Sequence, residues 1–198
     1  MKKPPKAKTN RDAIIEAALA GFIETGFHQT GIRDIAKRAG VSLGNLYNHF
    51  SGKDALIAEI ARIEAEDIDQ MLANLPNAGS PMDAVCALAT AILHQHSRPE
   101  NAILTADLTS EAMRNPVVAD VFAANGARID EALSGLIRDG IKRGEILAPV
   151  PVVDCVALIR DAAQSSGVRA AFEGSSSVRA ATKALDVMIR RLLANHTS

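Results

Sequence analysis

The sequence predicts an all-α protein, and three kinds of observation support this prediction. Apolar residues recur at intervals of three and four, and no segment alternates apolar and polar residues with the two-residue period of a strand. Helix-start signals and glycine or proline breaks follow one another at intervals that suit helices. Of the 198 residues, 47% are hydrophobic and 23% are charged, so the chain can bury one large core or two small ones.

Capping residues mark the starts of the expected helices. Thr9 with Asp12 fits a capping box, in which a hydroxyl and an acidic side chain satisfy free backbone N–H groups. Ser51 with Asp54 repeats the pattern, and Ser80 precedes a proline suited to a first helical turn. The expected helices are 10–25, 31–39, 43–50, 53–75, 81–97, 99–114, 116–143, 152–172 and 177–195.

Two adjacent short helices predict a helix-turn-helix unit. The segments 31–39 and 43–50 are joined by a tight turn around Gly40. Thr30 and Ser42 are expected to cap them. Helices this short need tertiary packing, which the first helix can supply. The expected small core is Ile14, Ala18, Phe22, Ile32, Ile35, Ala36, Ala39, Val41, Leu46 and Phe50.

The outer face of helix 43–50 carries no acidic residue, which favours contact with DNA. Gly44 permits close approach of the backbone to a duplex. Asn45 and Asn48 can hydrogen-bond base edges, and adenine is the natural bidentate partner of an asparagine.

Neighbouring residues are candidates for phosphate contacts. Tyr47 and His49 can donate to phosphate oxygens, and Lys53 adds a positive charge beside a helix N-terminus. Taken singly, Tyr47 also fits a place at the core edge, and His49 fits a capping or solvent-exposed role. Their combination with Gly44 and Lys53 favours DNA binding.

The charge distribution agrees with this interpretation. Residues 1–56 contain nine Lys or Arg and five Asp or Glu, a net charge of +4, whereas the remainder carries 13 and 18, a net charge of −5. A basic head on an acidic body suits a polyanionic partner. The lysine-rich arm 2–8 either reaches a DNA groove or phosphates, or is a solvated tail.

Residues 11–57, about a quarter of the chain, resemble the DNA-binding domain of the TetR family of transcriptional regulators. The matching positions are Ala17, Ala18, Leu19, Phe22, Gly26, Phe27, Thr30, Asp34, Ile35, Ala36, Ala39, Gly40, Val41, Ser42, Gly44, Leu46, Tyr47, His49, Phe50, Lys53 and Leu56. The resemblance implies an all-helical homodimer, DNA contacts from the second and third helices, and a separate ligand-responsive body.

By position, the resemblance implies roles for individual residues. Base-edge contacts fall near Arg33, Leu43, Gly44 and Asn45, phosphate contacts fall near Thr30, Tyr47, His49 and Lys53, and Asn48 suits either role. Gly31 stands where family members often carry Ser or Thr, so one hydroxyl contact is expected to be missing. Leu43 cannot hydrogen-bond a base, so we expect it to touch a thymine methyl group and DNA shape to contribute to specificity.

The last two expected helices predict a homodimer through 152–172 and 177–195. The later helix carries a wide apolar stripe of Val178, Ala181, Thr182, Leu185, Met188, Ile189, Leu192 and Leu193. The earlier helix carries the small residues Ala162, Ala163, Ser165, Ser166, Gly167, Ala170 and Ala171. We expect a four-helix interface with two helices from each chain, and the alternative is a core within one chain.

The middle helices are expected to enclose a pocket for a small-molecule effector. The candidate contacts are His96, Leu104, Asp107, Glu111, Phe122 and Gln164. Pairing with Arg114 or Arg128 is the alternative for the two acids, and a helix-capping role is the alternative for His96. The body holds only two aromatic residues, so an aliphatic or small polar effector is expected rather than a planar or choline-like cation.

Motifs for catalysis are absent from the sequence. No phosphate-binding loop, dinucleotide fingerprint, nucleophile elbow or His-Glu-x-x-His motif occurs, so no enzyme activity and no cofactor are expected. The acid-rich run 64–69 suits a solvated face better than a metal site. Two distant cysteines and the lack of an apolar run of 18 residues favour a cytoplasmic protein without a membrane span.

The sequence therefore predicts a ligand-responsive transcriptional repressor that acts as a homodimer on a palindromic operator. A helix-turn-helix domain is expected over 1–56, and an effector-binding and dimerisation domain over 57–198. Effector binding is expected to shift helix 53–75 and to move the two recognition helices out of register with the DNA grooves. The alternatives are an activator of the same fold and a small-molecule enzyme built on a helical body.

Overall fold

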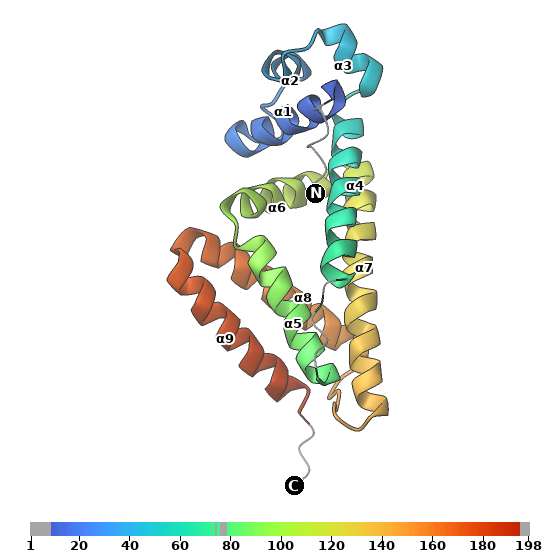
Figure 1. The fold of residues 1–198 in the computed structure, drawn as a ribbon, viewed down its shortest axis with the longest axis vertical. Coiled ribbons are helices and arrows are strands. Elements are labelled where there is room, and N and C mark those ends of the chain that lie inside the picture. The colour runs from blue at the N-terminus through green and yellow to red at the C-terminus, as the bar shows by residue number, and fades with distance from the viewer. Residues whose placement is uncertain (1–8, 74, 76–78, 195–198) are drawn as a thin grey trace, which may run out of the picture. The chain divides into compact units, whose positions relative to one another are not determined.

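The computed structural model describes residues 9–73, 75 and 79–194, and within these residues it contains nine helices and no strand. The helices are α1 (Asn10–Thr25), α2 (Ile32–Ala39), α3 (Leu43–His49), α4 (Lys53–Ala73), α5 (Pro81–His96), α6 (Pro99–Ala112), α7 (Pro116–Lys142), α8 (Val152–Glu173) and α9 (Ser175–Leu192) (Figure 1). The all-α expectation is confirmed. The lysine-rich arm 2–8 lies outside the described residues.

The chain folds into two compact units. The N-terminal unit combines residues up to Glu64 with the segment 106–122, and the C-terminal unit combines 65–105 with the residues from Ala123 onward. The helices α4, α6 and α7 each contribute residues to both units. The functional division that we expect between residues 56 and 57 stays a prediction.

Local capping explains where the first helices begin. The capping box at Thr9 is confirmed, and the Ser42 hydroxyl accepts the Asn45 N–H at the start of α3. The expectation for α2 was wrong, because its N-cap is Gly31 rather than Thr30. Gly31 has no side chain to offer, so the carboxylate at the third helical position satisfies its backbone N–H instead.

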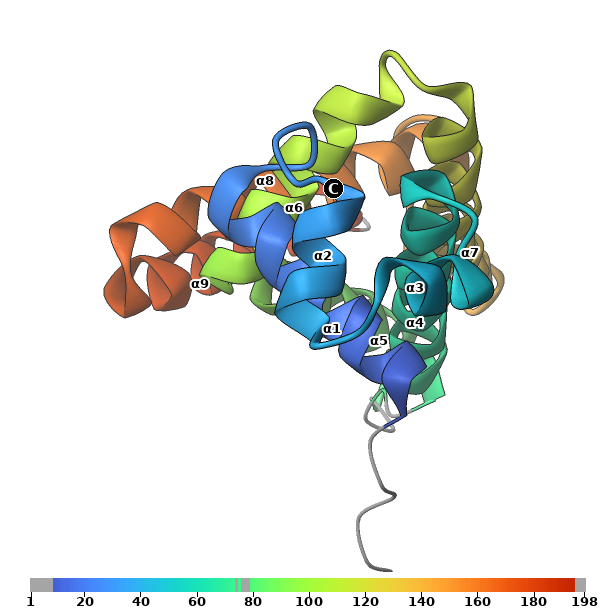
Figure 2. The ribbon, with the colours of Figure 1, turned by 90° about the horizontal axis from the view of Figure 1, so that it is seen from above.

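The N-terminal unit is built on a small apolar core. The helix α1 packs against α2, which leads into α3 through the left-handed turn at Gly40 (Figure 2). Fully buried side chains of this core are Ile14, Phe22, Ile35, Leu46, Leu56 and Ile57. Burying these side chains fixes which face of each short helix points to solvent.

The C-terminal unit is built around α5, which packs against both α8 and α9. Its core includes Leu88, Ile92, Leu93, Leu133, Ile137, Ile159, Leu185 and Ile189. Gly167 of α8 faces α5 so closely that a Cβ atom there would lie 2.5 Å from the carbonyl oxygen of Leu93. The small residue is therefore required by packing within the chain.

The expected assignment of the last two helices to a dimer face needs a correction. Buried within the core of this chain are Ala163, Gly167, Ala170, Ala181, Leu185, Ile189 and Leu193. These residues include much of the apolar stripe and of the small-residue surface, and they pack within one chain because α5 covers them. A dimer contact through these two helices would therefore have to use their exposed faces.

Among the residues that the structure describes, no helix has both the length and the apolar character needed to cross a membrane.

Candidate DNA-binding site

The helix α3 turns one face into the protein and the other to solvent. Leu46 is fully buried, and Phe50, directly after the helix, is 4% exposed. The opposite face carries the exposed residues Gly44, Tyr47, Asn48 and His49, with Leu43 and Asn45 half-buried at its edge. No acidic side chain occurs in the seven residues of the helix. The face can therefore approach a polyanion without charge repulsion.

The helix α2 adds basic side chains beside α3. Arg33 is exposed in its first turn, and Lys37 is exposed in its last turn. The guanidinium of Arg38 instead forms a two-pronged ion pair with Glu24 of α1, with N–O distances of 2.6 and 2.8 Å. Arg33 and Lys37 thus leave their positive charges at the surface, whereas Arg38 holds α1 against α2.

The structure corrects the expected role of the Thr30 side chain. It is only 4% exposed, and its hydroxyl donates to the carbonyl oxygen of Gly26 at 2.8 Å. The hydroxyl oxygen of Thr30 also lies 3.0 Å from the hydroxyl oxygen of Thr25. The side chain therefore ties the end of α1 to the start of α2, and its hydroxyl is not directed toward a phosphate.

The Lys53 side chain also turns inward. Its ammonium donates to the carbonyl oxygen of Phe27 and lies 4.1 Å from the centroid of the Phe27 ring. Burial lowers the pKa of the ammonium, and the charges of Glu111 and Asp54 act in the opposite direction. In this structure Lys53 holds the loop after α1 instead of extending toward a phosphate.

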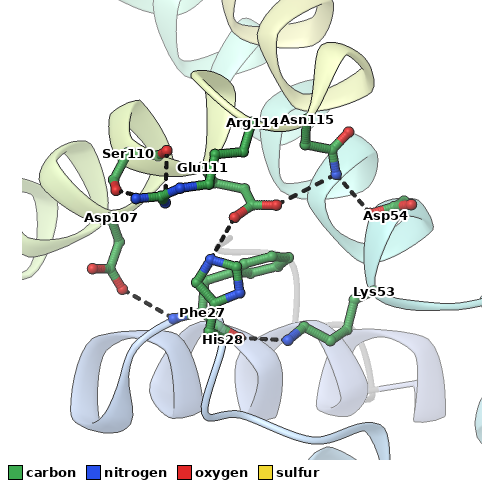
Figure 3. A network of polar contacts seen from close by, with 9 residues as sticks. All are labelled: Phe27, His28, Lys53, Asp54, Asp107, Ser110, Glu111, Arg114 and Asn115. Carbon is green, nitrogen blue, oxygen red and sulfur yellow. Dashed lines mark hydrogen bonds and ion pairs between the residues drawn. The ribbon is translucent and has the colours of Figure 1, made fainter.

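A polar network joins that loop to the end of α6 within the N-terminal unit (Figure 3). The carboxylate of Asp107 accepts the backbone N–H of Phe27 at 3.0 Å. Nε2 of His28 lies 2.8 Å from a carboxylate oxygen of Glu111, whose side chain is 8% exposed. Both acids therefore bind the loop between α1 and α2, from which the helix-turn-helix begins.

Asn115, just before α7, extends the same network to the start of α4. Its side-chain amide donates to Asp54 at 3.4 Å and to Glu111 at 3.5 Å (Figure 3). The neighbouring Arg114, in the turn after α6, bonds Ser110 of that helix. The segment around the α6–α7 turn thus contacts both the loop after α1 and the first turn of α4.

Sequence comparison identifies the family of the chain. Residues 14–60 match the profile described as "Bacterial regulatory proteins, tetR family". The HTH-type transcriptional regulator UidR of Escherichia coli strain K12 is 29% identical over 178 residues, which are 89% of this chain and 88% of UidR. The N-terminal part of the chain therefore carries a TetR-family DNA-binding domain. This TetR-family chain is thus a helix-turn-helix regulator of transcription.

Further relatives agree with this assignment. The HTH-type transcriptional repressor KstR2 of Mycolicibacterium smegmatis is 30% identical over 103 residues, covering 48% of this chain and 49% of KstR2. The solved structure of Salmonella enterica GusR superposes with a TM-score of 0.79 at 26% identity, covering 97% of this TetR-family chain and 99% of GusR.

The candidate effector contacts of this regulator are divided between the two units. Asp107, Glu111 and Phe122 belong to the N-terminal unit, and the two acids are engaged by the loop after α1. The partners considered from sequence were wrong, since Arg114 bonds Ser110 and Arg128 pairs with Asp69. His96, Leu104 and Gln164 lie half-buried in the C-terminal unit, and Nδ1 of His96 lies 2.9 Å from the Ile92 carbonyl oxygen.

The C-terminal unit of the regulator contains an open groove of about 600 Å³. It is lined by Met71, Leu75, Asp83, Cys86, Ala87, Thr90, Ala91, Asp186 and Arg190, and by none of the six candidate effector contacts. Arg190 is held at the groove by ion pairs with Asp83 and Asp186. Burial raises the pKa of the Cys86 thiol to about 12, so it is protonated near neutral pH.

Sequence reasoning also missed an ion cluster beneath α3. Glu59 of α4 is bonded by Arg11 at 2.6 Å and by Arg62 at 2.7 Å. The two arginine hydrogen bonds lower the pKa of Glu59 to about 2. The Arg11 guanidinium also lies 5.2 Å from the centroid of the Phe50 ring, which anchors the residue directly after α3. The spacing of three between Glu59 and Arg62 is a local signal for the pair within α4, whereas Arg11 comes from α1 and no spacing rule connects it to Glu59.

Proposed function

We propose that this TetR-family regulator is a cytoplasmic, non-enzymatic repressor that binds a palindromic operator as a homodimer and is released by a small-molecule effector. The acid-free, exposed face of α3, supported by the buried residues Leu46 and Phe50, carries the DNA-binding part of this proposal. A short recognition helix of this kind enters the major groove with its first residues at the base edges.

The proposed DNA contacts follow from exposure. Base contacts come from Leu43, Gly44 and Asn45 of α3 and from Arg33 of α2, and phosphate contacts come from Tyr47 and His49, with Asn48 in either role. Thr30 and Lys53 are left out of the set of side-chain contacts because their polar atoms are engaged inside the unit. Gly44 has open space on its outer side, which suits close approach to the duplex.

The homodimer is proposed through the outer faces of α8 and α9. Leu158 and Phe172 of α8 are 55% and 79% exposed, and Val187 and Met188 of α9 are 44% and 37% exposed. Large apolar side chains gathered on two neighbouring helices indicate an interface, because exposed apolar area of this kind favours burial by a partner. A two-fold dimer also supplies the second recognition helix that operator affinity requires.

Release by an effector is proposed to act through the network around Asp107, Glu111 and Asn115. These residues hold the loop after α1 and the start of α4 within one unit, while α6, α7 and α4 each contribute residues to both units. An effector that binds the DNA-incompetent state more tightly shifts α4 and the loop after α1. The recognition helices of the two chains then move out of register with the DNA grooves. The ligand class proposed is aliphatic or small polar.

The test combines DNA selection with a reporter. Full-length protein is used to enrich duplexes from a randomised pool, and the enriched duplex is measured by mobility shift at several salt concentrations. We expect a palindromic consensus and an affinity that falls steeply with salt. Enrichment of no sequence would contradict DNA binding at a specific operator.

The reporter distinguishes repression from activation. The enriched sequence is placed in a promoter, and expression is compared with and without the regulator. If the regulator is a repressor, deleting it raises expression of the reporter. Lower expression on deletion would make the protein an activator.

A further inference from the structure

Asn10, the first residue of α1, contacts the recognition helix. Its side-chain amide donates to Oδ1 of Asn45 at 3.5 Å, and the Asn10 side chain is exposed. The backbone N–H of Asn45 is separately fixed by the Ser42 hydroxyl at 3.1 Å. Asn45 is thus held by both its backbone and its side chain before DNA arrives.

The direction of this hydrogen bond decides which group Asn45 presents. One lone pair of the Asn45 carbonyl oxygen is taken up by Asn10, so the amide is oriented with its –NH₂ donor away from Asn10. A donor suits guanine best, because guanine offers two acceptors, O6 and N7, in the major groove. Adenine instead presents its own amino group beside N7, which conflicts with a donor-only approach.

Arg11, the residue next to Asn10, fixes the position of α1 relative to α3. Arg11 is bonded to Glu59 of α4 and lies over the ring of Phe50. The first turn of α1 therefore contacts α3 near its start through Asn10 and just beyond its end through Arg11. A positioning contact is effective only when it comes from such a fixed element.

We propose that Asn10 is a specificity-determining residue that orients the Asn45 amide to read guanine. The inference rests on the proposed function, since it concerns the base contact of α3. Asn10 acts through Asn45 and need not touch DNA. Pre-orienting a polar side chain removes part of the entropy cost of binding and penalises bases that require the opposite amide orientation.

The experiment compares variants by selection from randomised duplexes, using the full chain. The base pair read by Asn45 is the consensus position at which Asn45→Ala loses preference, by about tenfold. Asn10→Ala is expected to weaken the guanine preference at this position by about threefold and to leave other positions unchanged. Asn10→Asp can only accept, so it draws the Asn45 –NH₂ toward itself and turns Oδ1 outward. The preference is then expected to change from guanine to a base with an amino group, adenine or cytosine.

A control separates orientation from charge. Gln29→Glu makes the same change of charge at an exposed residue of the N-terminal unit and is expected to weaken binding to all duplexes without altering base preference. Circular dichroism verifies that each variant is folded. The proposal is overturned if Asn10→Ala and Asn10→Asp keep the wild-type preference, or if the wild-type base at the Asn45 position is not guanine. A wild-type selection without any consensus contradicts the proposed function instead.

Discussion

Glu59 keeps its negative charge inside the N-terminal unit because two arginines bond it. Arg11 reaches it from α1, and Arg62 reaches it from one helical turn further along α4. A single residue thereby joins α1 to α4, and through the contact of Arg11 with Phe50 it also supports α3. The charge of Glu59 therefore contributes to the stability of the DNA-binding unit.

Glu59→Gln is expected to lower the free energy of unfolding by about 2 kcal/mol at pH 7. The folded-state pKa of about 2 lies below the ordinary value of 4.5, so the contribution is complete above pH 4.5 and declines as the pH falls toward 2. Urea unfolding of both proteins at pH 7 and pH 3 measures the difference. A gap that is as large at pH 3 as at pH 7 would contradict the ion-pair explanation.

Thr30→Val tests whether the hydroxyl is structural. The substitution removes the hydrogen bond to Gly26 and is expected to cost about 1 kcal/mol of stability. The affinity for DNA is expected to stay the same, because no phosphate contact is lost. Thr30→Ser keeps the hydroxyl and serves as the control. A lower DNA affinity of folded Thr30→Val, with Thr30→Ser unchanged, would restore the phosphate contact implied by the sequence resemblance.

Among the elements, the helix starts were predictable and the packing faces were less so. Capping signals are local, so Thr9 and Ser42 marked the starts of α1 and α3 correctly. The buried part of the α9 stripe packs within this chain, since a stripe that suits a second chain suits α5 equally well. His28 and Glu111 lie far apart in the sequence, and no spacing rule connects them.

Packing of α8 against α5 is tested at Gly167. Gly167→Ala places a Cβ 2.5 Å from the Leu93 carbonyl oxygen, so the helices must separate and we expect a loss of about 2 kcal/mol in stability. Gly135→Ala in α7 is the matched control, because nothing lies within 4 Å of its Cβ position. That change is expected to stabilise the helix by about 0.5–1 kcal/mol. Thermal unfolding distinguishes the two.

The contact of α6 with the loop after α1 is tested at Asp107. Asp107→Ala removes the acceptor of the Phe27 N–H, and exchange of that amide with deuterium is expected to rise about tenfold. Asp120→Ala, an exposed acid in the same unit, is expected to leave the exchange of this amide unchanged. Unchanged exchange in Asp107→Ala would show that the loop is held without α6.

For the whole molecule, the proposed dimer would decide how two recognition helices are presented to DNA. Leu158→Glu and Val187→Glu each place a charge on the proposed interface, and light scattering is expected to show the 20.9 kDa mass of one chain instead of twice that mass. Met113→Glu, at a residue 82% exposed in the turn after α6, is expected to leave the dimer intact. Dimers that persist in both interface variants would place the contact elsewhere.

The segment 106–122 has a consequence for protein engineering. A chimera that joins residues up to Glu64 to the sensor half of another regulator would discard Asp107, Glu111 and Asn115, which satisfy the Phe27 amide, His28 and Asp54. The transplanted DNA-binding unit would then lack the side chains that bond its loop after α1. Grafts that carry 106–122 along with it, as a second inserted piece, are expected to keep their recognition helix in place.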